Sequence, residues 1–358
     1  MRLYLIGAGV SARTHVAAAA KLGEPVELRV ADPNAETLAG FLEAFPEATG
    51  YASAEEMLAA EQAREDDVAI VATPPRFHFA PAVAAARSGR HVLCEKPLAM
   101  TVDEAEEMLR VATEHGVLFG SCSTRFRGLP HNEAVKAVMA TGVLGDLVHL
   151  DFVTRSPRSR AGIEYQPSSR WFLDSRMSGG GVVMDWGPYD MSTLFDLLQP
   201  TRVEMVDAWM AKTRTGADPE GVVHDTESTA GAALRVTRQD GSVLRVNYQR
   251  ANATHGEEFA RAELEGTLAA LRWTPFDSHQ PVQLRTDAEG EPREETVEPP
   301  ERDDLSIFDR PLVHFVAALR GRPSLAAIGP IAVDEFRCVR GVYDTARTGR
   351  PTVVEVRR

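Results

Sequence analysis

Short apolar runs, separated by longer amphipathic stretches, fill the first third of the chain. The runs are continuous, as in strands buried on both faces of a sheet, and they predict strands at residues 3–7, 26–31, 68–73, 91–94 and 117–120. The stretches between them are rich in Ala, Leu and Glu, and capping-box patterns begin at Ser53 and Thr101. Repeated strand–helix units of this length predict a doubly wound parallel sheet of the Rossmann type.

The pattern changes after residue 122. Helices are predicted at 132–140, from the glycine run at 179–181 to near Leu198, and at 311–319 and 333–348. Shorter β patterns are predicted at 147–153, 228–237, 242–250, 261–265, 268–273, 282–284 and 352–356. The Glu- and Pro-rich stretch 287–304 is expected to be a solvated loop. We therefore expect a Rossmann domain at 1–122 and, at 123–358, an α+β domain with a mainly antiparallel open sheet.

Composition narrows the class of protein. A length of 358 residues agrees with two domains. The net charge of -13 argues against a nucleic-acid or anionic-membrane partner, and no apolar run approaches the roughly 20 residues of a membrane helix. The sequence shows no secretory signal, so we expect a cytoplasmic protein. Three cysteines without a C-x-x-C pair and scattered histidines predict neither a disulfide framework nor a metal site.

A glycine-rich turn follows the first predicted strand and opens the first helix. In the G-x-G-x-x-G/A pattern, Gly7 permits the bend, Gly9 lets the backbone approach a pyrophosphate, and Ala12 lets helix and strand pack closely. Val10 and Ser11 then begin the helix whose N-terminus would face the phosphates. The alternative is a glycine turn without function.

An acidic residue ends the second predicted strand. Asp32 lies twenty positions after Ala12, where a carboxylate would bind the ribose hydroxyls of NAD and repel the 2′-phosphate of NADP. No arginine follows it, so NAD is favoured over NADP. Alternatively, Asp32 caps the turn that it begins with Pro33 and Asn34.

Further motifs extend over nearly the whole chain. They are T-P-P-R-F-H at 73–78, E-K-P at 95–97, G-G-G-V-V-M-D-W-G-P-Y at 179–189 after Trp171, and A-R-T-G-R-P at 346–351. Together with the glycine turn they resemble the glucose–fructose oxidoreductase / inositol dehydrogenase / rhizopine-catabolism (Gfo/Idh/MocA) family. The resemblance implies bound NAD(P) and oxidation or reduction at a hydroxyl-bearing carbon of a sugar or cyclitol. It also implies a cis Lys96–Pro97 bond, the alternative being trans, and an open sheet that often mediates oligomerisation, so we expect a homodimer or homotetramer.

The ends of parallel strands carry the next candidates, because ligands of doubly wound sheets bind there. Glu95 and Lys96 end one strand, and the lysine could bind the reacting oxygen and lower its pKa; a surface lysine is the alternative. Thr73 and Pro74 end another and are expected on the nicotinamide-ribose side. His78, grouped with the cofactor site by its motif, is expected to bind backbone groups rather than transfer protons.

The second half contributes Asp185 and Tyr189, which share a face if their segment is helical. Pro188 is tolerated in a first helical turn, which predicts that Asp185 lies at or just before the helix start. There it could hold substrate hydroxyls or orient Lys96, or act only as an N-cap. The glycines before it suit a close approach to ligand or a flexible loop.

Tyr189 occupies the position where inositol and most related dehydrogenases carry histidine, and this weakens an inositol assignment. Arg125, Arg158 and Trp171 are candidate walls of the substrate site, and each could equally be structural. We expect Lys96 and Tyr189 to meet at one substrate oxygen, where the ammonium would lower the tyrosine pKa from its usual value near about 10.

These features predict an NAD-dependent dehydrogenase or reductase that transfers a hydride at a secondary alcohol of a sugar, cyclitol or related diol. Two alternatives stay open. One is a glycosidase that holds NAD and cleaves by oxidation, elimination and re-reduction. The other is a non-catalytic NAD-binding regulator, which would have no need of the set Lys96, Asp185 and Tyr189.

Overall fold

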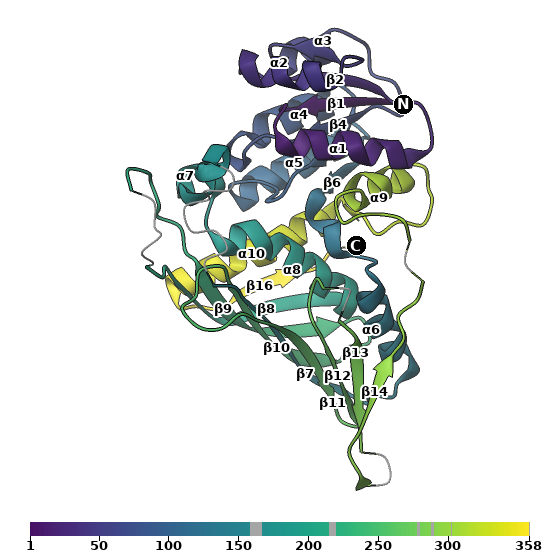
Figure 1. Cartoon of the computed structure of the whole chain (residues 1–358), viewed down its shortest axis with the longest axis vertical. Helices are drawn as coiled ribbons and strands as arrows, with labels where there is room; N and C mark the ends of the chain where they lie inside the picture. The colour runs from purple at the N-terminus through teal and green to yellow at the C-terminus, as the bar shows by residue number, and fades with distance from the viewer. Residues whose placement is uncertain (158–166, 215–219, 278–279, 288–289, 302, 358) are drawn as a thin grey trace. The chain divides into compact units, whose positions relative to one another are not determined.

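The computed structural model of the chain describes residues 1–157, 167–214, 220–277, 280–287, 290–301 and 303–357. It divides into two compact units (Figure 1). Unit 1 comprises residues 1–125 and 304–336, and unit 2 comprises residues 126–303 and 337–358. Among the described residues, no helix is both long and apolar enough to span a bilayer.

Unit 1 is a doubly wound sheet, as predicted. Its described strands are β1 (Arg2–Ile6), β2 (Glu27–Ala31), β3 (Thr49–Tyr51), β4 (Val68–Val71), β5 (His91–Cys94), β6 (Phe119–Ser121) and β15 (Ala327–Ile328). Their order is β15-β6-β5-β4-β1-β2-β3, and every pair is parallel except β15 with β6. The helices are α1 (Val10–Ala19), α2 (Ala35–Ala44), α3 (Ala54–Ala59), α4 (Phe79–Arg87), α5 (Val102–Glu114) and α9 (Arg310–Leu319). The carboxyl ends of the parallel strands therefore lie along the same edge of the sheet, where the candidate cofactor residues are found.

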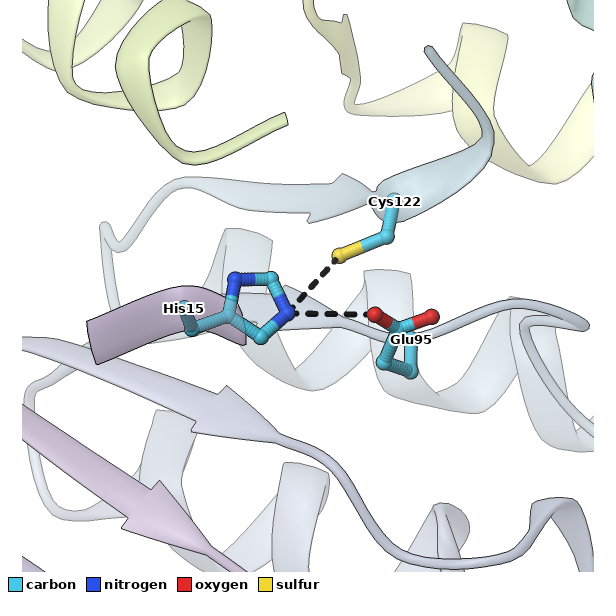
Figure 2. Close-up of side chains that lie close together, drawn as sticks. All are labelled: His15, Glu95 and Cys122. Atoms are coloured by element: carbon cyan, nitrogen blue, oxygen red, sulfur yellow. Dashed lines mark hydrogen bonds and ion pairs between the residues drawn. The ribbon is translucent and has the colours of Figure 1, made fainter. Parts of the chain in front are cut away.

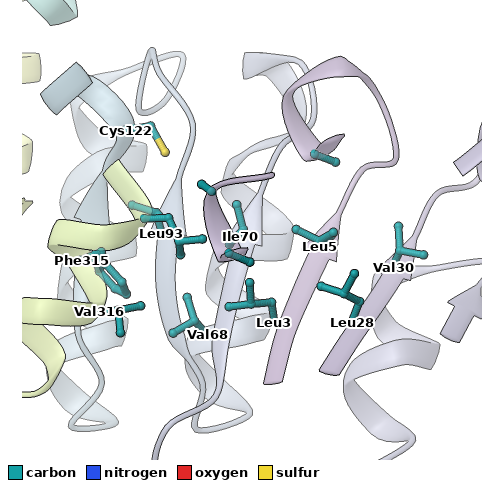
Figure 3. Packing of buried hydrophobic residues seen from close by; sticks show 14 of the residues in the cluster. Leu3, Leu5, Leu28, Val30, Val68, Ile70, Leu93, Cys122, Phe315 and Val316 are labelled. Atoms are coloured by element: carbon teal, nitrogen blue, oxygen red, sulfur yellow. The ribbon is translucent and has the colours of Figure 1, made fainter. Parts of the chain in front are cut away.

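Buried aliphatic side chains join α1 and α9 to one face of this sheet. Figure 3 shows Leu3, Leu5, Val30 and Ile70 in the cluster with Phe315 of α9. A Cβ atom on Gly120 of β6 would lie 2.8 Å from the Phe315 ring, so glycine makes room for that ring. This packing places residues 304–336 in unit 1, whereas the sequence pattern had grouped them with the second domain. The contact between Phe315 and the sheet joins residues far apart in the sequence, so no local sequence pattern predicts it.

Unit 2 contains a mainly antiparallel sheet, which confirms the predicted fold class. Its described strands are β7 (Leu147–Arg155), β8 (Pro200–Ala211), β9 (Thr229–Arg238), β10 (Val243–Ala251), β11 (Phe259–Gly266), β12 (Ala269–Trp273), β13 (Val282–Thr286), β14 (Arg293–Val297) and β16 (Thr352–Glu355). Their order is β14-β13-β12-β11-β7-β10-β9-β8-β16, and only β7 and β10 pair in parallel among them. Helix α8 (Val182–Leu198) packs on β9 and β10. The other helices are α6 (Pro130–Thr141), α7 (Ser175–Ser178) and α10 (Pro330–Thr348), which begins in unit 1.

Four described strands were not predicted, namely β3, β8, β14 and β15. Residues 287–304 were expected to form a loop, but β14 lies within them and pairs with β13. Its charged residues are exposed at the sheet edge, so the segment lacks the apolar alternation that marks a half-buried strand. The twelve-residue strand β8 was also missed. In the second half of β8, buried and exposed positions do not alternate clearly, because side chains on both faces of the strand are at least partly exposed.

A buried charge network lies at the amino ends of β1 and β4, opposite the strand ends that carry the candidate cofactor residues. Asp67 is fully buried, and its two carboxylate oxygens accept from Arg2 Nε at 2.8 Å and Arg2 Nη2 at 2.6 Å. The same carboxylate lies 3.8 Å from Arg90 Nε, and the Arg90 guanidinium carbon lies 4.2 Å from the centroid of the Tyr4 ring. Both arginines are almost completely buried. Arg2 also pairs with the Glu61 carboxylate, whereas Asp67 is the only carboxylate paired with Arg90 among the described residues.

We predict that Asp67→Asn lowers the free energy of unfolding by about 3–5 kcal/mol, because it leaves the buried Arg90 guanidinium without a carboxylate and Arg2 with Glu61 alone. Urea denaturation followed by circular dichroism measures this loss. Asp66→Asn is the matched control. Its side chain is 51% exposed and faces only the N-terminal ammonium at 3.7 Å among the ion pairs of the described residues, so a much smaller loss is expected. Equal losses for the two variants would contradict the assigned role of Asp67.

Candidate functional site

The glycine turn of unit 1 has the geometry that a pyrophosphate requires. Gly7 has φ +101°, and a Cβ atom there would lie 2.9 Å from the Ala72 carbonyl oxygen. A Cβ atom built on Gly9 would meet no atom of another described residue within 4 Å, chain neighbours aside, so the space beside Gly9 is open. Helix α1 starts at Val10, which is 58% exposed, and neither a described side-chain cap nor an acidic residue occupies its first turn. Backbone and helix N-terminus therefore fit an anionic diphosphate.

Asp32 follows β2 and contacts the same turn. Its Oδ2 accepts from the backbone N–H of Ala8 at 2.9 Å, and its Oδ1 accepts from the backbone N–H of Asn34 at 2.8 Å. The second contact is the turn cap that we considered as an alternative, so capping and ribose binding are compatible at this residue. The first contact adds something that the spacing did not predict, because it ties the carboxylate to the glycine turn.

The segment after β4 is held by a buried histidine. His78 Nε2 lies 2.7 Å from the Thr73 carbonyl oxygen, and its Nδ1 lies 3.3 Å from the Leu98 carbonyl oxygen. Burial lowers the pKa of His78, which favours the neutral imidazole. Its contacts are therefore structural and join the ends of β4 and β5. Thr73 and Pro74 are half-buried at this edge, and Thr73 Oγ1 donates to the Phe77 carbonyl at 3.1 Å.

Glu95, directly after β5, is buried among cationic and polar partners (Figure 2). Its Oε1 accepts from His15 Nε2 at 3.1 Å and from Arg125 Nη2 at 3.0 Å, and its Oε2 accepts from the Lys96 backbone N–H at 3.1 Å. Burial alone would raise the pKa of Glu95, but the charge of Arg125 and the hydrogen bond from His15 outweigh it. The pKa is therefore held well below its usual range. Glu95 stays ionised at neutral pH and anchors the backbone at Lys96, whose bond to Pro97 is cis, as the resemblance implies.

The same cluster has the composition of a metal site but not its chemistry. One ligand atom each of His15, Glu95 and Cys122 lies within 4.8 Å of the others, and Figure 2 shows the three side chains turned toward one another. However, Arg125 already donates to the carboxylate oxygen that would bind a cation. Burial also raises the pKa of the Cys122 thiol well above its usual value, whereas a metal needs the thiolate. These groups fit an ion-pair network better than a metal ion.

In unit 2, the first turn of α8 is held from outside the helix. The Glu227 carboxylate accepts from the backbone N–H groups of Gly181 at 2.7 Å and Val183 at 3.1 Å. The Glu227 carbonyl accepts from Val182, and Tyr343 Oη accepts from the N–H of Met184 at 3.1 Å. A Cβ atom on Gly181 would lie 1.8 Å from the Glu227 carbonyl oxygen, so glycine is required there. The donors that a helix start usually leaves open are thus satisfied by distant residues.

The predicted helix start needs one correction. We expected Pro188 in the first turn and Asp185 at or before the helix start, but α8 begins at Val182 and contains Pro188 in its interior. Asp185 lies in the first turn, and its N–H donates to the Gly181 carbonyl at 3.0 Å. It is therefore not the N-cap.

Because this segment is helical, Asp185 and Tyr189 share one face of α8, and both are at most 5% exposed. Tyr189 packs edge-on against Phe126 and Trp186, with ring centroids 5.2 and 5.7 Å apart. Asp185 also lines a recess of unit 2 whose other walls include Gly181, His224, Thr226, Glu227, Ser228 and Asn252. Phe172 and Leu173 also line this recess, and its volume of about 30 Å³ is too small for a sugar ring. Tyr189 is not part of it.

A buried ion pair fixes the same helix to the sheet. Asp190 is fully buried and accepts from Tyr248 Oη at 2.7 Å and from Arg250 Nε at 3.0 Å. The Arg250 guanidinium carbon lies 4.9 Å from the centroid of the Trp186 ring. Because Asp190 directly follows Tyr189, this pair sets the rotation of α8 about its axis and thereby the direction of Tyr189.

The candidate wall residues have different surroundings. The Arg125 guanidinium is held by Glu95 and lies 4.8 Å from the centroid of the Phe308 ring, so it is part of the ion-pair network of unit 1. Trp171 is half-buried and stacks on Phe172, with ring centroids 3.9 Å apart. Arg158 lies outside the described residues.

Sequence analysis missed His15, Glu227, Tyr343 and the pair Asp190–Arg250. One local feature could have indicated His15, because in α1 this imidazole is followed only by Val and Ala residues. The others are joined over 40 residues or more along the chain, beyond the reach of any motif.

Together, the sheet, the open glycine turn and the strand ends define a dinucleotide-binding oxidoreductase of the Rossmann type. Residues 1–122 match the model of an oxidoreductase family with an NAD-binding Rossmann fold, and residues 132–272 match that of the GFO/IDH/MocA C-terminal domain. The chain belongs to the Gfo/Idh/MocA oxidoreductase family.

Named relatives act on sugars. The chain is 28% identical over 294 residues to 1,5-anhydro-D-fructose reductase of Ensifer adhaerens, covering 81% of this chain and 80% of that protein. It is 27% identical over 209 residues to D-glucoside 3-dehydrogenase of Escherichia coli strain K12, covering 58% and 57%. A solved levoglucosan dehydrogenase in complex with NADH and levoglucosan matches with a TM-score of 0.78 at 17% identity, covering 99% of each chain. At that identity the structural match shows the shared fold.

Proposed function

We propose that this protein is an NAD-dependent dehydrogenase or reductase that acts on a secondary alcohol, or the matching ketone, of a sugar or anhydrosugar. The observation that carries the proposal is the ionised Glu95, which fixes Lys96 at a strand end on the same sheet edge as the open glycine turn. The sugar substrates named for the relatives support the substrate class.

The proposed cofactor site consists of the turn Gly7–Ala12, Asp32, and the strand-end residues Thr73 and Pro74. The α1 N-terminus would bind the pyrophosphate, and Asp32 would bind the adenine-side ribose. When bound, the nicotinamide supplies the acceptor or donor of a hydride.

The remaining chemistry falls to side chains of the protein. Lys96 would bind the reacting oxygen of the substrate and stabilise negative charge on it. Tyr189 would take the hydroxyl proton during oxidation and return it during reduction, with its phenolate favoured by the lysine charge. Asp185, in the first turn of α8, would hold neighbouring hydroxyls of the substrate. The proposal requires Lys96 and Tyr189 to act on one substrate oxygen.

A substrate panel tests the function directly. Nicotinamide absorbance would be followed in both directions with monosaccharides, anhydrosugars, glucosides, cyclitols, sugar acids and diols. Turnover of a sugar or anhydrosugar supports the proposal. Cleavage of a glycoside without net change in nicotinamide would identify the oxidation–elimination glycosidase instead. Tight NAD binding without turnover of any compound would favour a regulator.

We predict that Tyr189→Phe lowers kcat by roughly 100- to 10,000-fold, the usual contribution of a general acid–base group, and leaves NAD affinity nearly unchanged. Lys96→Met should reduce activity at least as much. Steady-state kinetics across pH and fluorescence titration with NADH measure the two quantities. If Tyr189→Phe keeps a near-normal kcat at every pH while Lys96→Met is inactive, the lysine transfers the proton and Tyr189 only packs or binds substrate.

We predict a preference for NAD over NADP, because the Asp32 carboxylate would repel a 2′-phosphate. Comparison of kcat/KM with the two coenzymes measures the preference, and Asp32→Asn should narrow it because the repulsive charge is lost. The Asn side chain keeps one acceptor oxygen, so it can retain only one of the two backbone hydrogen bonds that Asp32 accepts from Ala8 and Asn34, and circular dichroism should verify that the variant is folded. A wild-type preference for NADP would remove the proposed role of Asp32.

We also propose that the protein forms a homodimer or homotetramer through the outer face of the unit 2 sheet. Exposed Val243, Arg245 and Asn247 of β10 lie on that face beside Arg235 of β9 and His149 of β7. Size-exclusion chromatography with light scattering should give two or four chains, and Arg245→Glu should shift the mass toward one. A wild-type monomer at micromolar concentration would contradict the proposal.

A further inference from the structure

A histidine of the cofactor helix reaches the carboxylate that holds the Lys96 backbone (Figure 2). His15 lies on α1, five residues after its first residue Val10, and is 2% exposed. Its Nε2 lies 3.1 Å from Glu95 Oε1, and the other oxygen of Glu95 accepts from the Lys96 N–H at 3.1 Å. Two hydrogen bonds through one carboxylate therefore connect α1 with Lys96.

The direction of the first hydrogen bond follows from the charge of Glu95. An ionised carboxylate has no proton to donate, so His15 Nε2 must carry the hydrogen. Arg125 already neutralises the same carboxylate oxygen at 3.0 Å. His15 is thus not needed to compensate the charge of Glu95, and what it adds is a directional contact from a different element.

Packing alone does not explain an imidazole at this position. Its second nitrogen, Nδ1, is buried without a hydrogen-bond partner among the described residues. A buried polar atom of this kind costs stability, and an apolar side chain of similar size would avoid that cost. The neighbouring Cys122 offers only a weak contact, with Sγ 3.8 Å from His15 Nε2.

We propose that His15 is a positioning residue that couples the cofactor helix to Lys96 through Glu95. Phosphate groups bound at the N-terminus of α1 would restrain the helix, and His15 would transmit that restraint to the Glu95 carboxylate and the Lys96 backbone. This inference rests on the function proposed above, in which Lys96 binds the reacting oxygen. His15 does not itself touch the substrate.

Three substitutions at this position separate hydrogen bonding from packing. His15→Leu keeps much of the volume and loses the donor. His15→Gln keeps an N–H donor of similar reach, whereas the shorter His15→Asn keeps an amide that falls short of Glu95. The comparison of Gln with Asn remains informative if the leucine variant does not fold. Cys122→Ala is the matched control, because it removes a buried neighbour of His15 that has no hydrogen bond to Glu95 among the described residues.

The first measurement needs neither substrate nor cofactor. Amide hydrogen exchange of Lys96 in the cofactor-free protein reports the hydrogen bond that this N–H donates to Glu95. We expect exchange about fivefold faster in His15→Leu and His15→Asn, which corresponds to weakening one hydrogen bond, and near-normal exchange in His15→Gln and Cys122→Ala. Added NADH should slow the exchange in the wild type more than in His15→Leu.

The second measurement is kinetic. A displacement of a reacting group by about 1 Å can cost roughly 100-fold in rate, so we expect His15→Leu to lower kcat by about that factor with the dissociation constant of NADH little changed. His15→Gln should recover most of the loss, and Cys122→Ala should retain wild-type kcat.

Unchanged Lys96 exchange and kcat in His15→Leu would overturn the coupling, and so would an equal loss in Cys122→Ala, which would indicate packing. Stoichiometric zinc in the purified protein, lost in Cys122→Ala, would also overturn it by showing that the cluster is a metal site. Failure of the proposed function looks different: the wild type would then turn over no sugar in the nicotinamide assay, or Lys96→Met would keep the wild-type kcat. The exchange measurement decides the coupling in either case.

Discussion

The buried charge of Glu95 is the constraint on which the candidate site of unit 1 depends. A carboxylate can be removed from water only if cationic or hydrogen-bonding groups replace its hydration. Here the replacements come from α1, from the segment after β6, and from the backbone at Lys96. Because the charge of Glu95 must be satisfied, these three segments are held together at the end of β5. They lie next to Lys96, the residue proposed to bind the reacting oxygen.

In unit 2, the backbone N–H groups at the start of α8 also need partners from elsewhere in the chain. The open N–H groups of the first turn are satisfied by Glu227 and by Tyr343, which donates its own hydroxyl hydrogen to Glu227 at 2.6 Å. Burial raises the pKa of Glu227, partly offset by these hydrogen bonds. The helix start is thus fixed without a local cap, and Asp185 is held in its first turn.

Both units follow one principle. The buried carboxylates of Asp67, Glu95 and Asp190 and the half-buried carboxylate of Glu227 are each compensated by residues far away in the sequence. Such networks stabilise little when formed, because desolvation opposes them, but a missing partner is costly. They therefore specify which segments must lie together, and in this protein those segments carry Lys96, Asp185 and Tyr189.

Features whose causes are local could be predicted from the amino-acid sequence alone. Continuous apolar runs predicted β1, β2, β4, β5 and β6, the glycine turn predicted the start of α1, and E-K-P marked a strand end whose cis proline the family resemblance implied. Long-range pairing decided the rest. The exposed edge strand β14, the return of residues 304–336 to unit 1, and the partners of Glu95 and Glu227 arise from contacts between distant residues. Hydrophobic periodicity records which face of an element is buried, but not which distant charge meets it there.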